Sequence, residues 1–172
     1  MYWIVRLVQG LFKALNSEGT PGQVAAGFVL GAAIAFTPLT SLHTLVFVLA
    51  LFLLNVSVPG AMLGWVVFVP IAFILDPLFD RMGSTMLLGD GALDGVWGTV
   101  YNTPVLAFTN LTNSVVLGSL IGWALLAIPI FLAARWAVAR YRATIYERYR
   151  DAPIFRAVRA SKVYNAYRVF RP

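Results

Sequence analysis

The chain has 172 residues, of which 60% are hydrophobic and only 12% are charged. Residues 19–75 and 95–134 contain no Asp, Glu, Lys or Arg, whereas the helices and strands of a soluble domain expose one polar face to water. The composition therefore excludes an ordinary soluble enzyme and predicts an all-α integral membrane protein.

The first predicted element is an amphipathic helix in residues 1–19. Arg6, Gln9, Lys13 and Asn16 recur at spacings of three and four residues, which places them in one narrow stripe on a helix. The segment is too short to cross a hydrocarbon core of about 30 Å. We expect it to lie in the membrane interface with Arg6 and Lys13 contacting anionic headgroups; the alternative is a helix packed on the rest of the protein.

Residues 20–79 are predicted to form a hairpin followed by a transmembrane helix. Pro21 suits the first turn of a helix, and Pro38 interrupts the apolar run, which leaves two arms at 22–37 and 41–55. Each arm is about 22 Å long as a helix, which is short for a full crossing. We favour a re-entrant hairpin with its tip at residues 38–41; two short tilted spans are the alternative.

Three further segments complete the predicted topology. Residues 80–113 are read as an extracytoplasmic loop with short interfacial helices carrying Trp97 and Tyr101, residues 114–136 as a transmembrane helix, and residues 137–172 as a basic cytoplasmic helical tail. Residues 135–172 hold ten basic and two acidic side chains, whereas residues 1–134 hold three and five. By the positive-inside rule, both termini of this multi-pass protein are expected in the cytoplasm.

Pairs of glycines four residues apart occur in each long apolar segment. This spacing lets membrane helices approach closely, and it predicts six packing positions: Gly27, Gly31, Gly60, Gly64, Gly118 and Gly122. Each pair is followed by a proline at a similar distance, which indicates either a weak internal repeat or simply the abundance of Gly and Pro in membrane helices.

The turn between the hairpin arms holds the strongest candidate binding residues. They are Thr37, Pro38, Thr40, Ser41, His43 and Thr44. Polar groups at membrane depth are costly and therefore indicate function, and the free N–H groups at the start of the second arm would favour an anion such as a phosphate headgroup. In the competing interpretation the hydroxyls only cap the hairpin and His43 bonds to a carbonyl.

The same region carries a family resemblance. Its residues are Gly27-x3-Gly31, Phe36-x-Pro38-Leu39-x-x-Leu42-His43-Thr44-Leu45, Pro59-x3-Leu63-Gly64 and Pro70. This pattern resembles a family of small bacterial inner-membrane proteins of unknown function, in which the turn commonly reads Pro-x-x-Gly-Leu-Gln/His-Thr. Ser41 stands where that glycine is usual, and Val69 precedes Pro70 where Asn is common. The pattern also looks loosely like re-entrant proteins that move lipid carriers, which is analogy alone.

Charged residues at the ends of the apolar segments suggest membrane boundaries. Asp76 and Asp80 share a helical face, and we interpret them as ending a span in water, paired to Arg81. The alternative is a carboxylate pair that binds a cation or relays protons. Tail cations next to a cytoplasmic membrane surface favour anionic lipid over nucleic acid. The predicted contacts in the tail are Arg135, Arg140 and Arg142.

The functional expectations follow from these elements. Cysteine is absent and His43 is the single histidine, so we expect no metal site, no cofactor and no enzymatic activity. The leading hypothesis is a non-catalytic subunit of a homo-oligomer or larger envelope complex in the bacterial inner membrane, assisting lipid transport or presentation. The alternatives are an oligomeric channel or transporter for a small solute or ion, with its site at residues 38–44, and a pure membrane scaffold.

Overall fold

The computed structural model describes residues 19–38, 41–89, 91 and 93–146, and this part of the chain contains helices and no β-strand. The helices are α2 (Pro21–Phe36), α3 (Leu42–Leu53), α4 (Val58–Leu87), α5 (Asp94–Asn102), α6 (Pro104–Ala107) and α7 (Ser114–Tyr141), with a π-helical turn η1 (Arg142–Tyr146) continuing α7. The predicted interfacial helix, with Arg6 and Lys13, and residues 147–172 of the basic tail lie outside the described residues.

Polar side chains set where three helices begin. Thr20 and Gln23 form a capping box ahead of Pro21 in the first turn of α2, so two backbone N–H groups without helical partners are satisfied. The Ser57 hydroxyl accepts from the Gly60 N–H at the start of α4, at 3.2 Å. The Asn113 side chain accepts a corresponding bond at the start of α7. These caps explain why the three helices begin at defined residues.

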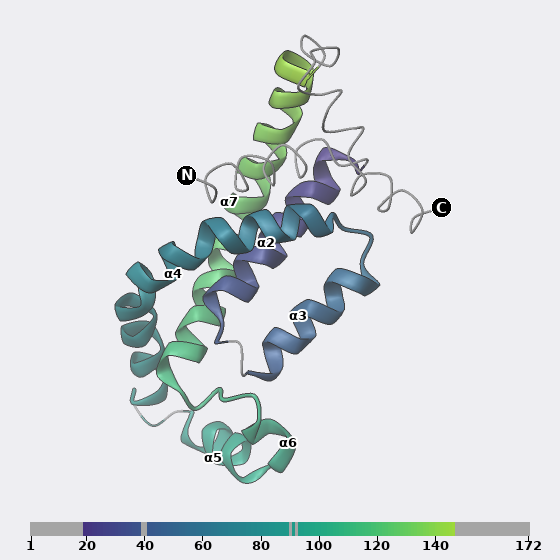
Figure 1. The fold of residues 1–172 in the computed structure, drawn as a ribbon. Helices are drawn as coiled ribbons and strands as arrows, with labels where there is room; N and C mark the ends of the chain where they lie inside the picture. Colours follow the sequence, from purple (N-terminus) through teal and green to yellow (C-terminus); the bar gives the residue numbers. More distant parts are fainter. Residues whose placement is uncertain (1–18, 39–40, 90, 92, 147–172) are drawn as a thin grey trace, which may run out of the picture.

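Two helices are long and apolar enough to cross a membrane among the described residues. They are α4, with 30 residues, and α7 with the turn that follows it, Ser114–Thr144, with 31 residues. Pro70 and Pro77 lie inside α4 and Pro129 inside α7. Each proline removes one backbone hydrogen bond, and α4 bends partway along its length (Figure 1). The apolar helices α2 and α3 are shorter, with 16 and 12 residues.

Close backbone contact joins α2 to α4. A Cβ atom added to Gly31 would overlap the carbonyl oxygen of Ala61, and one added to Gly64 would overlap that of Phe28. A Cβ on Gly60 would lie 2.6 Å from the Val24 carbonyl oxygen. Residue numbers rise together along both helices at these contacts, so α2 and α4 run parallel, and the small residues bring their backbones together.

A second crossing joins the far part of α4 to α7. A Cβ on Gly118 would overlap the Phe79 carbonyl oxygen, and one on Gly122 would lie 2.6 Å from the Phe79 ring. A Cβ on Gly83 would overlap the carbonyl oxygen of Ser114, so α7 runs antiparallel to α4. Together with the α2–α4 contacts, this places all six predicted packing glycines at helix crossings, Gly27 lying against Ser57.

The buried core lies where α2 and α4 meet, and α3 stands outside it. The Phe36 ring packs edge-on against both Phe68 and Phe79, with ring centroids 5.3 Å apart in each pair. In contrast, α3 buries only Thr44 among its twelve residues, and Figure 1 shows it beside α2 as a separate arm. Its Phe47 ring contacts Trp123 of α7 with centroids 5.0 Å apart.

The secondary structure departs from the prediction where residues 80–113 were read as a loop. Helix α4 continues through Asp80 and Arg81 to Leu87. Both side chains are exposed, so their charges stay in contact with solvent while the backbone hydrogen bonds of the helix continue. The remaining stretch forms α5 and α6, which lie together beyond the start of α7 (Figure 1). The Trp97 indole Nε1–H, on α5, donates to the Met86 carbonyl at 3.2 Å.

Candidate functional site at the hairpin tip

Three predicted hydroxyls come together at the tip of the α2–α3 hairpin. Thr37, Ser41 and Thr44 are 3%, 4% and 6% exposed. Thr37 Oγ1 donates to the Ala33 carbonyl at 2.9 Å, and Ser41 Oγ and Thr44 Oγ1 both donate to the Pro38 carbonyl, at 2.8 and 2.9 Å. Thr40, the fourth predicted hydroxyl, lies outside the described residues.

These hydroxyls are engaged with the hairpin itself. Thr44 Oγ1 also lies 3.1 Å from Thr37 Oγ1 and 3.2 Å from Ser41 Oγ. Three hydroxyl groups have three protons to donate, and each has a backbone carbonyl as acceptor. A hydroxyl–hydroxyl bond therefore forms only when one of these protons turns from its carbonyl to the neighbouring oxygen. The arrangement stabilises the chain reversal and leaves no donor of these three directed at a ligand. This geometry supports the interpretation that the hydroxyls cap the hairpin.

His43 follows a different pattern from its neighbours. Both of its ring nitrogens are buried, and neither has a hydrogen-bond partner in the described structure. Within the described residues, the bond from His43 to a carbonyl that the capping interpretation includes is therefore not formed. His43 lies one helical turn before Phe47 and so shares its face of α3, the face that meets Trp123 of α7.

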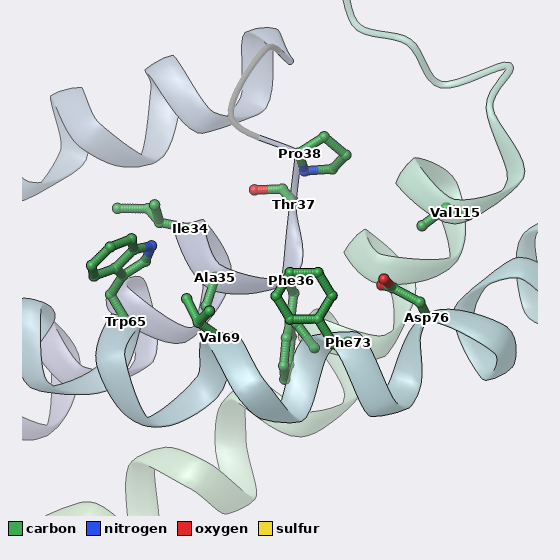
Figure 2. Close-up of a pocket in the computed structure, with 11 residues that line it drawn as sticks. Ile34, Ala35, Phe36, Thr37, Pro38, Trp65, Val69, Phe73, Asp76 and Val115 are labelled. Atoms are coloured by element: carbon green, nitrogen blue, oxygen red, sulfur yellow. The ribbon is translucent and has the colours of Figure 1, made fainter.

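A cavity of about 280 Å³ lies next to the hairpin tip. Its wall is formed by the end of α2 with Thr37 and Pro38, by Trp65, Phe73 and Asp76 of α4, and by the first turn of α7. Figure 2 shows Trp65 at one end and Asp76 at the other, with the carboxylate directed toward the space between Phe73 and Pro38. The cavity is an apolar hollow with one carboxylate at its rim.

The two aspartates of the predicted boundary have different surroundings. Asp80 is exposed and accepts a hydrogen bond from the Ser114 hydroxyl, which ties α4 to the start of α7. Asp76 is half-buried in the wall of the cavity. Within the described residues neither aspartate forms an ion pair with Arg81, so the expected pairing to that arginine is not present there.

The predicted basic contacts lie at the opposite end of α7. Arg135 and Arg140 are exposed. Arg142 is half-buried, and its Nη1 donates to the Gly19 carbonyl at 2.6 Å. This bond joins the C-terminal end of α7, which carries the basic side chains, to the segment that precedes α2.

Comparison with known proteins places the chain in a family. The profile of the family described as "Uncharacterized protein conserved in bacteria (DUF2062)" matches residues 6–149. The chain belongs to the DUF2062 family. Membership in a bacterial family of unknown function agrees with the resemblance drawn from the sequence. A protein of Treponema pallidum (strain Nichols), described as "Uncharacterized protein", is 27% identical over 156 residues, covering 91% of this chain and 96% of that protein. No solved structure matches this DUF2062 chain significantly.

Sequence reasoning overlooked part of the cavity wall. Trp65 and Phe73 were not singled out, because aromatic residues in an apolar helix carry no signal that separates a cavity wall from a lipid-facing surface. Asp76 was considered together with Asp80, as the end of a span or as a carboxylate pair able to bind a cation or relay protons, and not as part of a cavity wall. Its position next to Pro38 depends on the parallel packing of α2 and α4, which residue spacing alone does not determine. Among the described residues, no three His, Cys, Asp or Glu side chains group as metal ligands.

Proposed function

We propose that this DUF2062 protein is a non-catalytic, lipid-binding subunit of the bacterial inner membrane that acts in a homo-oligomer or larger envelope complex, assisting lipid transport or presentation. The cavity at the hairpin tip carries this proposal. Its wall is apolar with a single carboxylate, which suits an amphiphile, whereas the adjoining hydroxyls are bonded to the hairpin. A second cavity of about 330 Å³ between α2, the residues after α3 and α7 has an entirely apolar wall and suits an acyl chain.

The helix directions support a topology with both termini in the cytoplasm. α2 and α4 run parallel and α7 runs antiparallel to them, and Arg142 joins the basic end of α7 to the start of α2. The hairpin tip shares its cavity with Val115, the second residue of α7. In the proposed orientation the tip therefore reaches the extracytoplasmic end of the bundle, an arrangement that suits two short tilted spans better than a shallow re-entrant loop.

Filling the cavity tests the proposal. Ala35 lies in the cavity wall, and Ala35→Trp should displace bound phospholipid; a lost contact of about 1 kcal/mol lowers affinity about fivefold. Native mass spectrometry of protein purified in mild detergent measures the retained lipid. Ala124→Trp makes the same change at an exposed position of α7 and should retain lipid like the wild type. Wild-type protein that retains no lipid, or Ala35→Trp protein that retains a wild-type amount, would contradict the proposal.

A second candidate function is movement of a proton or small polar solute past the hairpin turn. The buried ring nitrogens of His43, which have no partner within the described residues, favour it. A polar group at membrane depth is costly, so its presence there indicates a function.

Proteoliposomes containing a trapped pH-sensitive dye test this second candidate. If His43 transfers protons, His43→Ala should lower proton flux roughly a hundredfold, the low end of what a positioned acid–base group contributes. Thr112→Ala changes an exposed residue in the segment between α6 and α7 and should leave the flux unchanged. Equal fluxes in wild-type and His43→Ala vesicles would exclude this role.

A further inference from the structure

We propose that the cavity at the hairpin tip binds the primary ammonium group of a zwitterionic phospholipid, with the Asp76 carboxylate as its partner. This inference rests on the proposed lipid-binding function and names the chemical class of headgroup. The starting observation concerns charge. Of the described residues that form the cavity wall, Asp76 is the only one with an ionisable side chain.

The Asp76 carboxylate is available to a ligand. It is half-buried, and within the described residues it makes no hydrogen bond or ion pair. Thr37, its polar neighbour across the cavity, already donates to the Ala33 carbonyl. A ligand that brings N–H donors and a positive charge can therefore form a charge-assisted hydrogen bond with this carboxylate.

Neighbouring groups favour a cation in the same place. Phe73 precedes Asp76 by three residues on one face of α4 and is 74% exposed, so its ring is accessible beside the carboxylate (Figure 2). An ammonium is attracted to the face of an aromatic ring. Pro77 lies inside α4 and has no N–H to donate to the carbonyl of Phe73. The Phe73 carbonyl oxygen therefore lacks its usual helical donor and is a second acceptor close to Asp76.

The same charge excludes other headgroups. A phosphate monoester or a glycerol phosphate brings a net negative charge toward Asp76 without a compensating cation, whereas an ethanolamine phosphate offers an ammonium with three donors. A quaternary ammonium keeps the charge but has no N–H to donate. A primary amine satisfies both the carboxylate charge and its hydrogen-bonding capacity.

The location suits a membrane lipid more than a free amine. The cavity lies where the charge-free run of 19–75 ends and α7 begins, which in the proposed topology is the level of the headgroups. Phe73 in the cavity wall and the next residue, Ile74, are the most exposed large apolar side chains of α4. A lipid can place its headgroup in the cavity and its acyl chains along this surface.

Competition between lipids tests the inference. Protein in mild detergent is exposed to equal amounts of phosphatidylethanolamine, phosphatidylglycerol and phosphatidylcholine, and the retained lipids are counted by native mass spectrometry. We expect phosphatidylethanolamine to exceed each of the others about tenfold, as one charge-assisted hydrogen bond predicts. Asp76→Asn, which keeps the shape and removes the charge, should abolish this preference, and Asp76→Glu should retain much of it.

The control variant is Asp80→Asn, which removes a carboxylate four residues away that is not part of the cavity wall. It should keep the wild-type preference. The thermal unfolding midpoint of Asp76→Asn should equal that of the wild type, so that a folding defect does not account for the loss. Free ethanolamine should not displace the bound lipid; displacement at equal concentration would assign the cavity to a free amine and overturn the lipid inference.

The failures of the two proposals are distinguishable. Wild-type protein that retains no phospholipid contradicts the proposed function itself. Wild-type protein that retains lipid without preferring the primary amine, or an Asp76→Asn variant that keeps the preference, overturns the headgroup assignment and leaves lipid binding in place.

Discussion

Replacing Gly118 with alanine is expected to destabilise the protein by about 3 kcal/mol and to lower its unfolding midpoint by roughly 6–12 °C. The added Cβ would overlap the Phe79 carbonyl oxygen and lie 2.6 Å from the Phe79 carbonyl carbon and 3.0 Å from its Cα. These are backbone atoms and cannot rotate away, so α4 and α7 must separate. Thermal unfolding in detergent, followed by circular dichroism, measures the change.

Gly95→Ala provides the matched control for this prediction. Gly95 is also helical, in α5, and an added Cβ there meets no atom within 4 Å. Alanine is the better helix former by about 1 kcal/mol, so this variant should be unchanged or slightly more stable. Gly83→Ala, from the facing side of the crossing, should resemble Gly118→Ala because its Cβ would overlap the Ser114 backbone. Equal midpoints for Gly118→Ala and Gly95→Ala would contradict the α4–α7 packing.

The ends of the helices were predictable where capping residues and prolines mark them. The start of α2 follows from Thr20 and Pro21, and its end from Pro38, because a capping hydroxyl and a ring-locked backbone act within a few residues. The end of α4 was placed too early, since Asp80 and Arg81 were read as the start of a loop. A charged pair marks the end of an apolar surface, but the backbone hydrogen bonds continue for another two turns to Leu87.

Which helices the glycines join could not be deduced from their spacing. Gly31 and Gly64 face the backbones of Ala61 and Phe28, whereas Gly118 faces Phe79, which belongs to no Gly-x3-Gly motif. A spacing of four residues defines a smooth face on one helix and contains no information on its partner. The partner is selected by the whole bundle, including the Trp123 indole N–H bond to the Val29 carbonyl at 3.1 Å.

Only the part of the candidate site that is local in sequence was predictable. Thr37, Ser41 and Thr44 lie within eight residues of chain, and a reversal at Pro38 brings them together in any folded hairpin. Asp76 and Phe73 approach Pro38 only because α4 packs parallel to α2, with a 30-residue helix beginning at the opposite end of the hairpin. The local turn is thus encoded by nearby residues, and the cavity beside it by long-range packing.

This separation assigns different roles to the two halves of the tip. The hydroxyls bond to the backbone of the chain reversal. Asp76, in the cavity wall, carries the charged group that a ligand could contact. A change in the hydroxyls should therefore alter the opening of the hairpin more than the headgroup preference, whereas a change at Asp76 should do the reverse.

Thr44→Val is the variant that measures the first of these roles. Valine has nearly the shape of threonine but has no hydroxyl, so it removes the donor to the Pro38 carbonyl and the acceptor next to Thr37 and Ser41. Losing these buried hydrogen bonds should destabilise the hairpin by about 2 kcal/mol. Because α3 buries so little else, we expect this loss of stability to appear as local unfolding of α3. Amide hydrogen exchange in the first turns of α3 should become about thirtyfold faster.

Hydrogen exchange followed by mass spectrometry, with peptides covering α3 and α4, resolves this local effect. Thr85→Val is the matched control, because Thr85 also donates to a carbonyl, that of Arg81 at 2.8 Å, but from an exposed position. Water replaces that bond, so exchange should change by less than about twofold. If amide exchange in α3 of Thr44→Val is unchanged, the hydroxyls do not stabilise the turn. They would then again be candidates for binding a ligand.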